Sequence, residues 1–214
     1  MDLGLGNLAT LKTHLLKGAM NTDQYPDLDT DIIAIGQGVA AGFEKYCART
    51  FKRAEDIQET TNGGRNFMLV SVYPIEAVSL VELKTDEATG WLTQAGVIRM
   101  NNLKAGLLTF WSMLGLETSL IRITYTGGFW YDAVEADPSA DPPVDPGEIP
   151  DGANPLPADL KLAWLLQCEN IFAAHDKMGQ SVSADPDAKS KIATVALVPE
   201  VKRILDAYRR ISIL

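Results

Sequence analysis

Four side chains of the 214-residue sequence are candidates for metal binding or nucleophilic chemistry: Cys47, Cys168, His14 and His175. A zinc site needs about four such ligands at short spacing. The sequence has no C-x-x-C and no H-x-x-x-H; Cys168 and His175 are seven residues apart and could share a helix face, but two ligands do not form a site. We therefore expect no metal or other cofactor, and two buried thiols in a reducing compartment.

Catalytic and nucleotide-binding motifs are also incomplete. Residues 179–183 lack the last glycine of a G-x-S-x-G nucleophile elbow, and Gly63-Gly64-Arg65 lacks the G-K-[ST] of a phosphate-binding loop. Residues 27–31 resemble the start of a calcium loop, but Ile32 stands where that loop requires glycine. Helix capping explains those acids better. The sequence predicts no enzyme.

The charge balance argues against a protein that binds nucleic acid tightly. The chain has 19 Lys and Arg against 28 Asp and Glu, a net charge of -9. Binding to the phosphate backbone needs the opposite balance, whereas an acidic surface would leave passing DNA free to slide. No stretch without charged residues reaches the about 20 apolar residues of a membrane span. The N-terminus lacks the basic region of a signal peptide, so we expect neither export by that route nor a membrane partner.

The spacing of apolar residues predicts helices in the first part of the chain. Leucines recur at intervals of three and four in Asn7–Met20, which indicates an amphipathic helix. Residues 21–28 contain a proline and two acids and predict a loop. Asp29 or Thr30 would then cap a second helix that continues to Cys47.

Glycines interrupt this second helix at positions 36, 38 and 42. Each weakens a helix by about 1 kcal/mol relative to alanine, so a packing role is expected. Small residues on one helix face let another helix approach closely. Gly38 and Gly42 are therefore predicted to lie at a contact between subunits.

The period of the pattern changes from 3.6 to 2 between Arg53 and Thr126. Asn66–Val72 and Ala77–Leu83 predict two strands joined around Tyr73-Pro74, and Ser119–Tyr125 predicts a half-buried strand. Pairs such as Gly63-Gly64 and Gly127-Gly128 predict turns. Together they indicate a small antiparallel sheet.

The last part of the chain returns to helices after an acidic segment. Residues 132–157 hold seven of the eleven prolines and no basic residue, which predicts an extended loop. Leu160–Met178 is apolar on most of its circumference and needs partners on more than one side, so Trp164 and Phe172 join the predicted subunit contact. Pro199 begins a final amphipathic helix.

These elements predict an α+β fold, a helical bundle of N- and C-terminal helices with an inserted small antiparallel β domain. The predicted boundaries are 1–52 for the N-terminal helices, 53–131 for the β region, 132–157 for the loop and 158–214 for the C-terminal helices and a docking tail.

Two apolar segments remain open to two interpretations. The aromatic run Tyr125–Tyr131, with Phe110-Trp111, is either a core corner that closes the sheet or a contact surface, because Trp and Tyr are enriched at interfaces. The terminal Ile211-Ser212-Ile213-Leu214 either frays or docks on a partner as an added strand or short helix.

Several motifs, taken in order, resemble the head-tail connector (adaptor) proteins of tailed bacteriophages. None is specific alone; their order across about residues 25 to 210 carries the resemblance. They are Tyr46-Cys47-Ala48-Arg49-Thr50-Phe51, Val72-Tyr73-Pro74-Ile75, Ile123 to Phe129, Pro157 to Ala163, and Pro199 to Arg209. The sequence departs from the family pattern at 132–157 and in a longer section around 84–118.

The resemblance implies a structural protein of the virion, located at the head-tail interface and made in the cytoplasm of the bacterial host. Twelve copies would form a ring beneath the portal, extend the DNA conduit, help to retain the packaged genome and present a platform for the tail or a further neck protein. DNA would pass without sequence-specific binding. The segment implied to dock on the portal is Tyr208, Arg209, Arg210, Ile211, Ile213 and Leu214.

Three other functions remain open at this point. Another neck or tail-completion ring would differ only in its partner. A small enzyme would show His14 or His175 together with carboxylates in a pocket. A glycan- or peptide-binding module would use the aromatic run.

Overall fold

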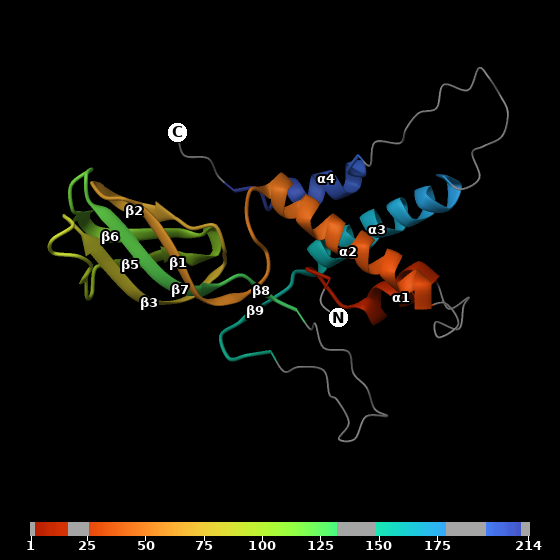
Figure 1. Ribbon diagram of the computed structural model, residues 1–214, viewed down its shortest axis with the longest axis horizontal. Coiled ribbons are helices and arrows are strands. Elements are labelled where there is room, and N and C mark those ends of the chain that lie inside the picture. The colour runs from red at the N-terminus through yellow and green to blue at the C-terminus, as the bar shows by residue number, and fades with distance from the viewer. Residues whose placement is uncertain (1–2, 17–25, 132–148, 179–195, 211–214) are drawn as a thin grey trace, which may run out of the picture. The chain divides into compact units, whose positions relative to one another are not determined.

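A computed structural model describes residues 3–16, 26–131, 149–178 and 196–210 (Figure 1). The described residues form two compact units. The helical unit comes from Met1–Ala48, Tyr131–Glu148 and Leu156–Leu214, and the β unit from Arg49–Trp130 and Ile149–Pro155. The predicted α+β class is confirmed, with antiparallel strands inserted between N- and C-terminal helices.

Four helices build the helical unit: α1 (Leu8–Leu16), α2 (Pro26–Cys47), α3 (Ala158–Met178) and α4 (Pro199–Asp206). Helix α3 packs against the other three, and α2 also contacts α1 and α4 (Figure 1). The fully buried side chains of this core come from all four helices and from the segment before α1. They include Leu3, Leu5, Leu11, Ile32, Phe43, Leu160, Trp164, Val201 and Leu205.

Helix α2 begins earlier than the sequence predicted. Its first residue is Pro26, so the predicted loop is wrong over 26–28, and so is the predicted cap at Asp29 or Thr30. Proline is favoured at the first position of a helix because the amide hydrogen it lacks would have no intrahelical partner there. The predicted helix Asn7–Met20 is found as α1 up to Leu16, and residues 17–25 lie outside the described residues.

Two antiparallel sheets face a common core in the β unit (Figure 1). One sheet has the order β1-β7-β3-β4, and its strands are β1 (Ala54–Asn62), β7 (Leu120–Gly127), β3 (Ile75–Lys84) and β4 (Leu92–Thr93). The other has the order β2-β6-β5, with β2 (Arg65–Leu69), β6 (Leu107–Leu114) and β5 (Ile98–Asn102). The short 3₁₀ helix η2 (Leu103–Ala105) precedes β6.

Strands β2 and β3 correspond to the two strands predicted on either side of Tyr73-Pro74, but they do not pair with each other. Strand β2 pairs with β6, whereas β3 pairs with β7 and β4. The Tyr73-Pro74 bond is cis, and both side chains are buried where the chain passes from one sheet to the other. The single predicted sheet is therefore two sheets.

The end of the predicted acidic loop contains a short strand. Residues 132–148 lie outside the described residues, but β9 (Asn154–Pro155) pairs in parallel with β8 (Phe129–Trp130). Helices α3 and α4 begin within two residues of their predicted positions.

Candidate functional site

The cysteines and histidines do not form a reactive centre in the described part of the chain. No group of three or more His, Cys, Asp or Glu residues is placed there to hold a metal ion. Both cysteines are buried; the Cys47 thiol donates to the Leu205 carbonyl at 3.5 Å, and burial raises the pKa of Cys168 to about 12. A thiol with such a pKa is a poor nucleophile at neutral pH.

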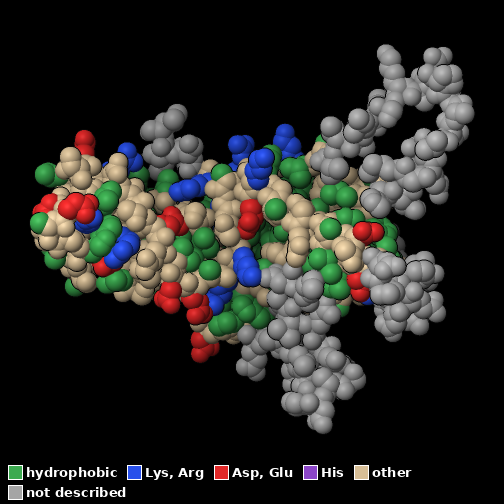
Figure 2. Space-filling view, viewed as in Figure 1, with side chains coloured by type: hydrophobic (Ala, Val, Ile, Leu, Met, Phe, Trp, Pro, Cys, Tyr) green, Lys and Arg blue, Asp and Glu red, His purple; other side chains and the backbone are tan. Residues whose placement is uncertain are grey.

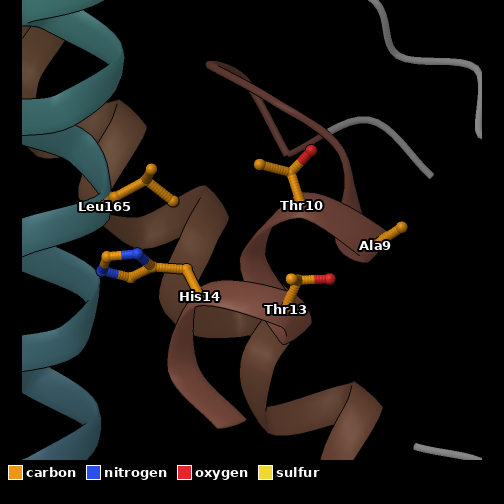
Figure 3. Close-up of a pocket in the computed structure, with 5 residues that line it drawn as sticks. All are labelled: Ala9, Thr10, Thr13, His14 and Leu165. Carbon is orange, nitrogen blue, oxygen red and sulfur yellow. The ribbon is translucent and has the colours of Figure 1, made fainter. Parts of the chain in front are cut away.

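A hollow between α1 and α3 contains His14 (Figure 3). It is lined by Ala9, Thr10, Thr13, His14 and Leu165. The His14 ring points toward α3, where its Nε2 lies 3.3 Å from a carboxylate oxygen of Glu169, while Thr13 points away from the ring (Figure 3). The histidine and the carboxylate connect two helices, and no hydroxyl that lines the hollow is aligned with the imidazole as a nucleophile. The side chain of His175, the other predicted candidate, lies outside the described part of the chain.

A buried corner of the β unit explains three of the sequence motifs at once. The Arg49 guanidinium lies 3.3 Å from the centre of the Tyr73 ring and within 5.4 Å of the Phe51 and Phe129 rings. Bridges join Thr50 to Val72 and Lys52 to Phe129. A larger residue would not fit at Gly128, because φ is +102° and a Cβ would lie 2.6 Å from the Lys52 carbonyl oxygen. The motifs mark a junction where three chain segments meet.

Glu59 on β1 is half-buried and connects its own sheet to the segment between β2 and β3. One of its carboxylate oxygens accepts hydrogen bonds from the Ser71 amide at 2.9 Å, the Ser71 hydroxyl at 2.7 Å and the Tyr125 hydroxyl. Burial and the bond to Glu59 raise the pKa of Tyr125, so the phenol remains protonated. These polar contacts are all internal to the β unit, which indicates a structural role.

The aromatic run Tyr125–Tyr131 belongs mainly to the core, but Trp111 on β6 does not. Tyr125 and Phe129 are buried, as is Phe110. Trp111 is 68% exposed, as is Met113 on the same strand, and Arg99 from β5 lies 5.3 Å from the Trp111 ring. The core-corner interpretation therefore fits Tyr125, Phe129 and Phe110, whereas Trp130 and Tyr131 are half-buried and the exposed apolar side chains lie on β6.

The predicted subunit-contact residues divide into two groups. Trp164 is fully buried in its own unit, and its indole N–H donates to the Gly36 carbonyl at 3.0 Å. This side chain has no surface left for a neighbouring subunit. Gly38 and Gly42 lie on the exposed face of α2, where an added Cβ would meet nothing within 4 Å among the described residues, and Phe172 is half-buried.

The end of α4 is tied to two other helices of the helical unit. The Tyr208 hydroxyl donates to Asp159 at 2.7 Å, the Tyr46 hydroxyl donates to Asp206 at 2.6 Å, and the Arg210 amide donates to the Cys47 carbonyl at 2.8 Å. Ile211, Ile213 and Leu214 lie outside the described residues. Tyr46, Asp159 and Asp206 lie in the sequence motifs, but their pairings were not predicted, because the two hydrogen bonds span 49 and 160 positions and leave no local pattern.

Comparisons with known proteins bear on the fold. No protein-family model and no curated protein sequence matches this chain. Two solved structures match it with a TM-score of 0.58, covering 97% of this chain and 90% of theirs. One, at 15% sequence identity, is described as "Neck of empty GTA particle computed with C6 symmetry". The other, at 16%, is described as "Virion of native gene transfer agent (GTA) particle".

The chain shares its fold with proteins of these particles. The similarity extends through both units, since 97% of the chain is covered. No described helix has the length and apolar character needed to cross a bilayer.

Proposed function

We propose that this chain is a structural protein of the neck of a phage-like particle, located at the head-tail interface. The observation that carries the proposal is the match across both units to a chain from the neck of a gene transfer agent particle. The order of the sequence motifs supports the same assignment independently.

Copies of the chain would form a ring around the DNA conduit. A single head-to-tail interface, repeated around an axis, closes into a ring. The six-fold symmetry named for the similar neck is compatible with six copies and with the twelve that the connector resemblance implies. The net charge of -9 supports a conduit through which DNA slides without sequence-specific contacts.

The exposed face of α2 is the proposed subunit interface, with Gly38 and Gly42 as contacts, and Phe172 on α3 is a further proposed contact. Glycine inside a helix is costly, and nothing among the described residues of the helical unit accounts for Gly38 and Gly42. Trp164 is left out of this interface because its side chain is used internally.

The C-terminal segment is the proposed contact with the portal. Arg209 is exposed at the end of α4 and leads into the apolar residues Ile211, Ile213 and Leu214. Another neck or tail-completion ring remains the second candidate, because the similar chain is described only as part of a neck. The two candidates differ in whether the portal or a tail protein binds this segment.

Mass photometry of the purified chain, alone and mixed with portal rings, tests both parts of the proposal. We expect a species of about 280 kDa for twelve copies or about 140 kDa for six, from 23.3 kDa per chain, and binding to the portal that is lost when residues 211–214 are deleted. A strict monomer under both conditions would refute the ring. Portal binding that survives the deletion would refute docking through the tail.

A further inference from the structure

The sheet β2-β6-β5 has apolar side chains on the face that points away from the core. On β6, Phe110 is buried in the core, whereas Trp111 and Met113 are each 68% exposed. Phe67 on β2 lies opposite Thr109 of β6, so it shares the side of the sheet on which Trp111 and Met113 lie. Trp and Met are enriched where one protein binds another. This outer face is therefore a candidate docking surface.

The charged residues of the same sheet are all basic. Strands β2, β5 and β6 contain Arg65 and Arg99 and no acid, although the whole chain has a net charge of -9. Arg99 lies 5.3 Å from the centre of the Trp111 ring, and Arg65 is exposed at the start of β2. Neither arginine forms an ion pair with a carboxylate of the described residues. A ligand that complements this face carries carboxylates beside apolar side chains.

One segment of the chain has this composition. Residues 132–148 lie outside the described residues, and their sequence holds six acids, four prolines and no base. Proline-rich segments bind to aromatic surfaces, because the fixed φ of proline lowers the entropy lost on docking. Carboxylates form charge-assisted hydrogen bonds with the guanidinium fork of arginine. The segment therefore matches the outer face in charge and in apolar character.

The places where this segment leaves and rejoins the β unit favour a neighbouring copy as its source. Trp130 and Ile149, which flank it, belong to the β unit, at the end where β7 leads into β8. Met113 lies toward the opposite end, where the Gly64 amide donates to the Leu114 carbonyl. A segment of this length that leaves and returns reaches about 28 Å at full extension. Strand β7 alone spans about 26 Å, before the path turns to the other sheet, so binding within one copy would have almost no slack.

We propose that the outer face of the sheet β2-β6-β5 binds the acidic, proline-rich segment 132–148 of a neighbouring copy. This inference rests on the proposed function, because the ring supplies the neighbour. Trp111 and Met113 pack against proline rings, and Arg65 and Arg99 donate hydrogen bonds to carboxylates. The contact is additional to the proposed interface on α2, so each copy is joined to the next at two places.

A labelled peptide of residues 132–148 tests the chemistry of this face. The receptor is the full chain with its own residues 132–148 replaced by a Gly/Ser linker of equal length. Fluorescence anisotropy should show saturable binding that weakens as salt is added. Trp111→Ala should weaken binding about 30-fold and Arg99→Gln about five- to tenfold. A peptide with Asn and Gln in place of its acids should not bind.

Leu92→Ala is the matched control for this experiment. Leu92 is an exposed apolar residue on β4, in the other sheet, so its replacement should leave peptide binding unchanged. The Tm should stay close to that of the original chain in every variant, because the replaced side chains are exposed. Absence of peptide binding would overturn the site, and so would binding that neither Trp111→Ala nor Arg99→Gln weakens.

A pair of cysteines identifies the copy that supplies the segment. In the full chain carrying Met113→Cys and Ala140→Cys, mild oxidation should give covalent dimers and larger species on a denaturing gel. The single variants give the background, since the native Cys47 and Cys168 are buried. A cross-link confined to monomers would overturn the neighbouring copy as the source. Rings that form although the peptide does not bind would overturn this inference alone, whereas a strict monomer in mass photometry would refute the ring as well.

Discussion

Two exposed glycines of α2 give the sharpest prediction, because their effects on folding and on assembly should have opposite signs. In the interior of an exposed helix, alanine is more stable than glycine by about 1 kcal/mol. A Cβ at Gly38 or Gly42 would meet nothing within 4 Å in the described part of the helical unit. We therefore expect the double variant Gly38→Ala/Gly42→Ala to raise the free energy of unfolding by about 2 kcal/mol. For a chain of this size, that corresponds to a rise in Tm of about 4–8 °C.

The affinity between subunits should change in the opposite direction and become weaker. If α2 packs closely against a neighbouring copy, each added methyl group enters a filled interface, and overpacking costs about 1–3 kcal/mol. Because every 1.4 kcal/mol is tenfold in affinity, each subunit contact should weaken by roughly five- to 100-fold per methyl group. Circular dichroism gives the Tm, and mass photometry over a range of concentrations gives the ring population.

Gly36 provides the matched control on the same helix. A Cβ there would lie 3.1 Å from both Leu11 Cδ2 and Leu3 Cδ1, so Gly36→Ala should lower or cancel the stability gain while leaving the outer face unchanged. A stabilised double variant that still forms rings with unchanged affinity would refute the interface. A destabilised double variant would show that the exposed face is covered within the chain.

Three further predictions concern the two cores. Trp164→Ala should lower the free energy of unfolding of the helical unit by about 3–5 kcal/mol in denaturant titrations, and a near-neutral effect would contradict its assigned burial. Burial and the bond to Glu59 raise the pKa of Tyr125, so the folded chain holds the phenol proton more tightly than the unfolded chain does. The free energy of unfolding should therefore fall as the pH rises above about 10. In Tyr125→Phe, which has no phenol to titrate, it should fall less steeply. Cys168, with a pKa of about 12, should react with iodoacetamide at pH 8 only after unfolding, and rapid labelling of the native chain would disprove its burial.

Local patterns in the sequence were enough to predict most of the helical unit. Periodic apolar residues located α3 and α4, and Pro199 correctly predicted the start of α4. At Pro26, the proline was assigned to a loop although it begins a helix. A proline terminates one element or starts another, and only the packing of the residues after it decides between them.

The β unit was harder to predict because its strands depend on distant partners. Strand β1 is polar along most of its length and carries no strand pattern of its own; its pairing with β7 and the bonds of Glu59 stabilise it. The two strands around Tyr73-Pro74 were recognised, but not that they enter different sheets. Local propensity indicates that a segment forms a strand, but it does not show which other strand pairs with it.

For the candidate site residues, too, local patterns predicted some features, and contacts between distant residues decided the others. The exposed positions of Gly38 and Gly42 fit the expectation from their place on α2, whereas the prediction for Trp164 could not take into account its hydrogen bond to Gly36. Tyr208 stays a predicted portal contact; the hydrogen bond of its hydroxyl to Asp159 was not predicted. Long-range pairings of this kind are fixed by tertiary packing, so one sequence cannot reveal them.

The surface of the chain mixes both signs of charge over the helical and β units, as Figure 2 shows for one face. Acidic and basic side chains alternate there with apolar ones, and no large basic patch is visible on this face.

Cryo-electron microscopy of the proposed phage-like particle tests the central proposal most directly. We predict that the helical unit and the β unit will appear in the neck, repeated around the particle axis in six or twelve copies, with the exposed face of α2 against a neighbouring copy. A neck without this chain, or a single unrepeated copy of it, would contradict the account.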